Sequence, residues 1–376
     1  MDISFKVDPE IIIGEDTISL AGTICSRYGE RIMIAADQDM DSQTVNRLKE
    51  ILVDSRLEAI VFDGIQEDSP VSVAENIVDL ACAAHCNVII GLGGPKAQII
   101  ARMAALMAPL RMSAFDLMEG RECMGKFLPF VAIPTTGIDP FTFTEYFVAA
   151  DPRDRLVKKI NSPGNLYAAV ILDSALFHFV SGFSAGASVF DGFCSAIEAY
   201  CSSKASFLSD ALLERALLFY AKLLNGGADG IDVSTFTQAG FLTALGAAIS
   251  SPGTGAALSF AVSARFPAVK RLCSAALLPA IAERLVKARP EKMARVASFL
   301  GNAGKTASVA DAANSVIEGI SRCMEAMKVP ANLKEYKIPL DRLTAAAEAA
   351  RNLEFIPNSP WTVTEEDVFD MLKKIF

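Results

Sequence analysis

The chain has 376 residues, 52% of which are hydrophobic, and a formal net charge of −9. This length favours two domains over one, and the acidic balance without a concentrated basic stretch excludes a typical nucleic-acid-binding protein. No uncharged apolar run reaches the roughly 18 residues that a membrane helix needs. The N-terminal residues lack the pattern of a secretory signal, and the eight cysteines are dispersed, as in proteins of a reducing compartment. We therefore expect a cytoplasmic protein that binds neither nucleic acid nor membrane.

Short apolar runs alternate with amphipathic segments in the first half of the chain. The pattern predicts strands at 31–36, 59–62, 87–91 and 127–133, and helices at 41–53, 71–84 and 95–108. The strands are continuously apolar, which is typical of a parallel sheet covered by helices on both faces. Residues 1–173 are therefore predicted to form a Rossmann-like α/β domain of the dinucleotide-binding type.

The second half of the chain has helical spacing almost throughout, with glycine and proline as punctuation. Helices are predicted at 184–203, 206–224, 234–249, 271–287, 291–301, 307–327, 340–352 and 365–375. Residues 174–376 are therefore predicted to form an all-helical domain. The richest apolar stretch, from Ala168 to Val180, is interrupted by Asp173, and the apolar excess of the chain is attributed to alanine-rich packed helices.

A glycine-rich segment lies between a predicted strand and a predicted helix, where it includes Gly91, Gly93 and Gly94. Glycines allow a pyrophosphate to approach the backbone, and the helix N-terminus supplies free N–H groups. The alternative is a turn that needs glycines for steric reasons alone. Asp37 follows another predicted strand, where an acidic residue either accepts hydrogen bonds from ribose hydroxyls or simply forms a turn.

Several segments together resemble the iron-containing (group III) alcohol dehydrogenases. They are the glycine segment, Pro134-Thr135-Thr136, the stretch from Asp191 to Tyr200, and Leu277-Leu278-Pro279. The resemblance implies the fold that this family shares with dehydroquinate synthase. It also implies an NAD(P)-linked oxidoreductase that acts on alcohol or carbonyl groups of a small molecule bound in an interdomain cleft, and a homodimer.

The resemblance further implies that Thr135, Thr136 and Lys158 contact the cofactor. Two departures from the family pattern are expected to weaken binding. Leu92 replaces the middle glycine of the turn and is expected to crowd the diphosphate, whereas Asp139 is expected to repel it. If a cofactor binds, Asp37 favours NAD over NADP, because a carboxylate repels a 2′-phosphate.

The family binds its metal ion through one aspartate and three histidines. The corresponding positions here are Asp191, Ser195, Ala256 and Lys270. The chain has only two histidines, His85 and His178, and neither lies at these positions. One carboxylate and one hydroxyl are too few donors for an iron or zinc site. We therefore expect no bound metal, with Asp191 as a remnant of the site.

Lys270 suggests a replacement for the metal charge. If the helices keep the family arrangement, its ammonium group is expected within about 4 Å of the Asp191 carboxylate and in a position to polarise a carbonyl. The alternative is a solvated lysine beside Arg271. Three functions stay open at this point: an oxidoreductase that works without metal, an inactive relative that binds a small ligand or a protein partner in the cleft, and a lyase of the dehydroquinate synthase type.

Overall fold

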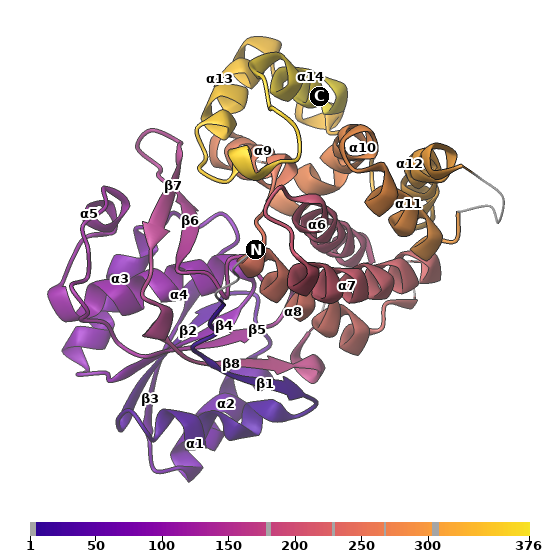
Figure 1. The fold of residues 1–376 in the computed structure, drawn as a ribbon. Coiled ribbons are helices and arrows are strands. Elements are labelled where there is room, and N and C mark those ends of the chain that lie inside the picture. The colour runs from indigo at the N-terminus through magenta and orange to yellow at the C-terminus, as the bar shows by residue number, and fades with distance from the viewer. Residues whose placement is uncertain (1–4, 178–181, 228–229, 267, 303–307) are drawn as a thin grey trace. The chain divides into compact units, whose positions relative to one another are not determined.

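The computed structural model describes residues 5–177, 182–227, 230–266, 268–302 and 308–376. The chain divides into two compact units (Figure 1). The first unit contains Met1–Asp154 and Lys158–His178, and the second contains Arg155–Val157 and Phe179–Phe376.

The first unit is built on a parallel sheet, as the sequence predicts. Its strands are β1 (Glu10–Gly14), β2 (Arg31–Asp37), β3 (Glu58–Ile65), β4 (Val88–Gly93), β5 (Phe130–Pro134) and β8 (Tyr167–Asp173). Their order is β1-β8-β5-β4-β2-β3, and every neighbouring pair is parallel. A separate two-stranded sheet contains β6 (Tyr146–Ala150) and β7 (Val157–Asn161).

Helices cover both faces of the six-stranded sheet (Figure 1). They are α1 (Ala21–Cys25), α2 (Ser42–Asp54), α3 (Val73–Ala83) and α4 (Pro95–Met107), and a short α5 (Ala114–Met118) follows. One core cluster joins α1 and α2 to a single face of the sheet through side chains such as Leu48, Ile34 and Ile90. Burial on both faces explains why these strands are continuously apolar rather than alternating.

Strand β8 corrects one interpretation of the sequence. No strand is predicted after 127–133 and the apolar excess is attributed to helices, but Tyr167–Asp173 is a strand that pairs with β1 and β5. The Asp173 carboxylate ends this strand and accepts the backbone N–H groups of Asp16 and Ile18, both at 3.0 Å. Apolar runs of this length fit a buried strand and a buried helix equally well, and only the pairing partner distinguishes them.

The register of the central strands places three chain turns side by side. Ala36 of β2 pairs with Leu92 of β4, and Gly93 of β4 pairs with Pro134 of β5. Because these strands are parallel, the segments after β2, β4 and β5 leave the sheet at the same edge. Ligands of open α/β sheets bind at this carboxyl edge.

From residue 182 on, the described part of the second unit contains helices and no strand. Its helices are α6 (Gly182–Cys201), α7 (Phe207–Gly226), α8 (Val233–Ile249), α9 (Thr254–Arg265), α10 (Lys270–Ala288), α11 (Pro290–Phe299), α12 (Val309–Ala326), α13 (Leu340–Arg351) and α14 (Glu365–Ile375). Helix α9, which has one glycine and several other small residues, is not among the predicted helices. Among the described helices, none alone is long and apolar enough to cross a membrane, and the one pair that passes together, α8 with α9, is bent by 105°.

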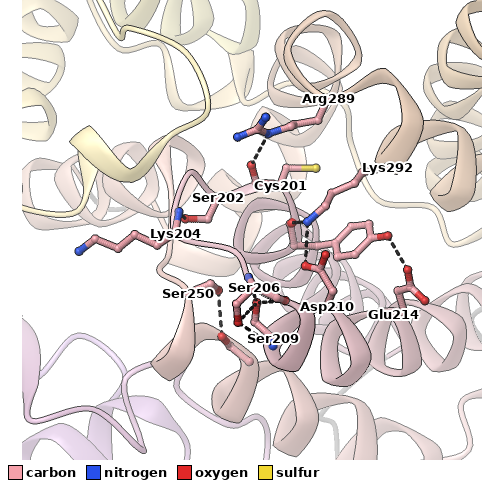
Figure 2. A network of polar contacts seen from close by, with 12 residues as sticks. Cys201, Ser202, Lys204, Ser206, Ser209, Asp210, Glu214, Ser250, Arg289 and Lys292 are labelled. Carbon is pink, nitrogen blue, oxygen red and sulfur yellow. Dashed lines mark hydrogen bonds and ion pairs between the residues drawn. The ribbon is translucent and has the colours of Figure 1, made fainter. Parts of the chain in front are cut away.

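Hydrogen bonds and an ion pair join the C-terminal end of α6 to α7 and α11 (Figure 2). Lys292 of α11 donates to the carbonyl of Tyr200 at 2.6 Å and to the Asp210 carboxylate at 2.7 Å. Arg289 donates to the carbonyl of Cys201 at 3.5 Å. Two cations therefore lie at the negative end of the helix that carries Asp191.

Candidate functional site

The first unit brings together four of the predicted cofactor-binding residues at the carboxyl edge of the sheet. The backbone N–H of Gly94 donates to Asp37 Oδ2 at 2.5 Å. A Cβ atom on Gly93, whose φ is +144°, would collide with the same oxygen, and one on Gly94 would lie 2.6 Å from Thr136 Oγ1. Only glycine leaves room for Asp37 and Thr136 to lie this close to the backbone. We call residues 91–94 the glycine turn.

The structure corrects the expected role of Leu92. Strand β4 continues to Gly93, so that alternate side chains of residues 88–93 point to opposite faces of the sheet. Leu92 therefore follows Ile90 into the core cluster under α1 and α2, where it is fully buried. Its side chain does not point into the turn, and the prediction that it crowds the diphosphate is wrong.

The second turn follows β5. Thr135 is fully buried and its backbone N–H donates to the carbonyl of Gly93 at 3.1 Å. Its Oγ1 has no hydrogen-bond partner within the described part of the chain. Thr136, in contrast, is half-buried beside Gly94. The two threonines therefore differ: Thr136 is available to a ligand at the glycine turn, whereas Thr135 fixes the strand end.

Asp139 and Lys158 have contacts of their own. Asp139 Oδ1 accepts the backbone N–H of Phe141 at 2.8 Å, and the residue lines a small cavity beside the buried Arg102. A cation therefore lies close to this carboxylate, which weakens the expectation that it repels a phosphate. Lys158 lies on β7, outside the six-stranded sheet, and pairs with Asp154 at 2.6 Å.

The second unit places Asp191 and Lys270 in direct contact, as predicted. Lys270 begins α10, and its Nζ lies 2.6 Å from Asp191 Oδ1 on α6. The two side chains are 20% and 24% exposed, so the pair is mostly withdrawn from water without being sealed. The ammonium group also lies 5.1 Å from the centre of the Phe260 ring. A carboxylate and an aromatic face thus fix one positive charge.

Glu198 is a residue of this cluster that the sequence analysis missed. It lies seven residues after Asp191, on the same face of α6, and is almost completely buried. Its carboxylate accepts the N–H groups of Gly255 at 2.6 Å and Ala256 at 3.0 Å, at the start of α9. Burial raises the pKa of Glu198 to about 7, although these N–H groups and the Lys270 charge act in the opposite direction. The sequence carried one signal for Glu198: positions 191, 195 and 198 are spaced so that they lie on one face of a helix.

The side chains present do not fit the family's metal ion. Ser195 Oγ donates to the carbonyl of Asp191 at 3.0 Å, and the methyl group of Ala256 offers no donor atom. Burial raises the pKa of the Cys194 and Cys273 thiols, which are therefore protonated in the protein at neutral pH. Within the described residues, no three His, Cys, Asp or Glu side chains could hold a metal ion together.

The two histidines of the chain lie at other positions in the sequence. His85 is exposed at the end of α3 in the first unit, and His178 lies outside the described residues. The Lys270 ammonium group occupies the position beside Asp191 where a cation would bind.

Each of the two units matches a known family model. Residues 8–174 match the family model for iron-containing alcohol dehydrogenase, and residues 185–376 match the model for the C-terminal part of the Fe-containing alcohol dehydrogenase family. The 1,3-propanediol dehydrogenase of Citrobacter freundii is 22% identical over 375 residues, which covers 96% of each chain. The choline dehydrogenase of Bacillus subtilis is 25% identical over 310 residues, 80% of this chain and 76% of that protein.

Solved structures share the fold along the whole chain. A crystal structure of 1,3-propanediol oxidoreductase superposes with a TM-score of 0.92 at 21% identity and covers 100% of both chains. Sulfoacetaldehyde reductase from Bifidobacterium kashiwanohense, solved in complex with NAD+, superposes with a TM-score of 0.84 at 17% identity and covers 100% of this chain and 99% of that one.

Proposed function

This chain belongs to the iron-containing alcohol dehydrogenase family, and we propose that it is an NAD(P)-linked oxidoreductase for alcohol or carbonyl groups that works without a bound metal ion. The observation that carries the proposal is the contact of 2.6 Å between Lys270 Nζ and Asp191 Oδ1. The contact supports an ammonium group of this chain at the position where, by the resemblance, the family binds a metal cation. The substrate is a small molecule, and we propose a cytoplasmic homodimer by resemblance to the family, with no nucleic-acid or membrane partner.

The glycine turn supports the cofactor part of the proposal. We infer that the diphosphate of a nicotinamide dinucleotide binds beside Gly93 and Gly94, next to Thr136. Asp37 would then face the ribose hydroxyls and favour NAD over NADP. Weak binding stays a proposal, but for a new reason: Asp37 already accepts the Gly94 N–H, so this donor must exchange its partner before it can serve a phosphate.

Lys270 would provide the electrostatic part of catalysis. A bound nicotinamide supplies or accepts the hydride. The ammonium group would stabilise the negative charge that develops on the substrate oxygen and exchange a proton with it. Asp191 would hold this ammonium group in a fixed orientation, and Phe260 would shield it from water.

One observation favours a second candidate, an inactive relative that binds a small ligand or a protein partner. Asp191 and Lys270 satisfy each other's charge directly, so the pair is stable without any ligand. A family member that has lost its metal and needs no replacement would show the same contact.

Steady-state kinetics of the chelator-treated protein separate these candidates. We expect NADH-dependent reduction of members of a panel of small aldehydes in the presence of EDTA. Lys270→Met should lower kcat by at least about 100-fold, as loss of an oxyanion-stabilising donor does, while NADH binding is kept. Lys287→Met, an exposed lysine near the end of the same helix, is the matched control.

Two other results would contradict this proposal. Activity that appears only when a divalent cation is added would refute metal independence. NADH binding without turnover of any substrate would favour the inactive relative.

A further inference from the structure

Helix α4 carries two buried polar side chains on one face, four residues apart. Gln98 is 8% exposed and Arg102 is 3% exposed. A spacing of four places both on the same side of the helix, and polar groups at such depth are retained only where they make hydrogen bonds.

Gln98 reaches back to the glycine turn. Its Nε2 donates to the carbonyl of Gly91 at 2.8 Å and to that of Gly93 at 3.2 Å. Its backbone N–H donates to the carbonyl of Gly94 at 3.1 Å. A Cβ atom on Gly91 would lie only 3.0 Å from Gln98 Oε1. One residue therefore binds three carbonyl groups of the turn, and the first glycine makes space for it.

The two donated hydrogen bonds fix the orientation of the Gln98 amide group. Nε2 must face the carbonyls, so Oε1 faces away from them. Oε1 is buried and has no hydrogen-bond partner among the residues that the structure describes. Gln98 lines a cavity of about 10 Å³, together with Arg102, Asp139, Thr142 and Tyr167. This is about the space that one water molecule needs, and the lining is polar enough to hold it.

Arg102 fixes the chain on the other side of this cavity. Its guanidinium group donates to the carbonyls of Phe141 at 3.1 Å and Thr144 at 2.9 Å, and to Ser162 Oγ at 3.3 Å. The ring of Phe147 lies 4.5 Å from its charge. The segment that Arg102 holds, residues 141–144, lies shortly after Thr136 in the chain. Helix α4 thus binds the glycine turn through one side chain and the segment that follows the second turn through another.

We propose that Gln98 is a positioning residue that fixes the glycine turn, and that one buried water molecule links its Oε1 to the segment held by Arg102. The proposal rests on the proposed function only in naming a nicotinamide dinucleotide as the molecule that the turn receives. Its direct readout is the rigidity of the turn, which needs no cofactor.

Gln98→Met tests the positioning role, because methionine has a similar volume but donates no hydrogen bond. We expect backbone amides in peptides that cover 91–98 to exchange about tenfold faster because the hydrogen bonds from Gln98 Nε2 are lost, a change that corresponds to about 1.4 kcal/mol. The KM for NADH should rise by about 5- to 30-fold while kcat changes by less than about twofold. Ile99→Val is the matched control, since Ile99 lines the same cavity without binding the turn.

Gln98→Glu gives a readout that a purely structural role would not produce. When it is protonated, the introduced carboxyl group can donate to the carbonyl of Gly91 or of Gly93. In its carboxylate form it is repelled by both carbonyl oxygens. Burial and this repulsion raise the pKa of the introduced group in the folded state. The turn should therefore be protected at low pH and exchange faster as pH rises, after correction for intrinsic exchange, and the wild-type turn should not change.

Unchanged exchange in Gln98→Met relative to Ile99→Val would overturn the positioning role. A crystal structure at high resolution with no water beside Gln98 Oε1 would overturn the proposed link. Failure of the wild-type protein to bind NADH, with the turn still loosened by Gln98→Met, would refute the proposed function and leave the positioning role standing.

Discussion

At the scale of single residues, the contact between Asp191 and Lys270 is the central feature of the second unit. A carboxylate that is withdrawn from water requires a cation or a proton. In the family that cation is a metal ion, whereas here it is a side chain in direct contact. A covalently tethered ammonium group does not dissociate, so under the proposed function the charge balance at Asp191 would not depend on metal supply.

A double-mutant cycle measures the strength of this pair. Lys270→Met should lower the free energy of unfolding by about 1–3 kcal/mol, less than for a sealed pair because both side chains keep some contact with water. Asp191→Asn combined with Lys270→Met should recover part of this loss. Denaturant unfolding provides the measurement. Strictly additive costs would show that the two side chains do not interact in solution.

Glu198 predicts a dependence of stability on pH. Its pKa is raised from 4.5 to about 7 by burial, so folding favours the protonated form. This contribution is fully present below about pH 4.5 and is lost as pH rises through about 7, by about 3 kcal/mol at most. Glu198→Gln, which cannot ionise, should show a smaller fall over this range, as followed by unfolding at several pH values. The exposed residue Glu50→Gln is the control, and a profile identical to wild type in Glu198→Gln would contradict the prediction.

At the scale of elements, successive side chains of β4 point to opposite faces of the sheet, and this alternation decides which of them lie on the side of the proposed cofactor site. Leu92 looks like an obstacle when the glycine segment is taken as a loop. As part of a strand, it faces the core under α1 and α2, while the glycines on either side of it face α4 and Gln98. Neighbouring residues of β4 therefore differ in role: Leu92 belongs to the core, whereas Gly91 and Gly93 lie on the side of the proposed ligand.

Leu92→Gly should therefore destabilise the protein without improving cofactor binding. We expect a loss of about 3–6 kcal/mol, since a buried leucine leaves a cavity and glycine loosens the strand. Leu92→Met, which conserves volume, should cost less than about 1.5 kcal/mol. Calorimetric titration with NAD should show no gain in affinity for either variant. Tighter binding by Leu92→Gly would return Leu92 to the cofactor site.

Helix α6 depends on cations at its C-terminal end (Figure 2). Lys292→Met removes two donated hydrogen bonds, to Tyr200 and Asp210, and a favourable charge at the negative end of the helix. We expect a loss of about 1–3 kcal/mol in thermal or denaturant unfolding. Lys204→Met, an exposed lysine after the same helix, should have almost no effect. Equal effects of the two variants would show that the network in Figure 2 adds no stability.

At the scale of the whole molecule, the proposed lack of a metal site has a thermodynamic consequence. A metal that binds only the folded state raises its stability by mass action. We therefore expect EDTA, zinc or iron(II) to shift the melting temperature by less than about 1 °C. Differential scanning fluorimetry provides the test, and elemental analysis of the purified protein the control. A clear stabilisation by one cation that Asp191→Asn abolishes would show that a metal site exists.

The sequence by itself determined the strands and helices whose patterns are strong, and with them the parallel sheet and most of the helical unit. Periodicity is a local property of the chain, so α2, α4 and α10 were recognisable without any partner. The spacing of Asp191 on its helix was local as well, and the family resemblance supplied Lys270 as its partner.

Only the tertiary structure decided which buried groups meet. Asp37 and Gly94 are 57 residues apart, as are Glu198 and Gly255, and no local pattern encodes such a distance. The same holds for β8, which is a strand because β1 and β5 lie beside it, and for Leu92, whose direction depends on where β4 ends. Side-chain direction and hydrogen-bond partners are properties of the packed chain, because burial and pairing act between segments that only folding brings together.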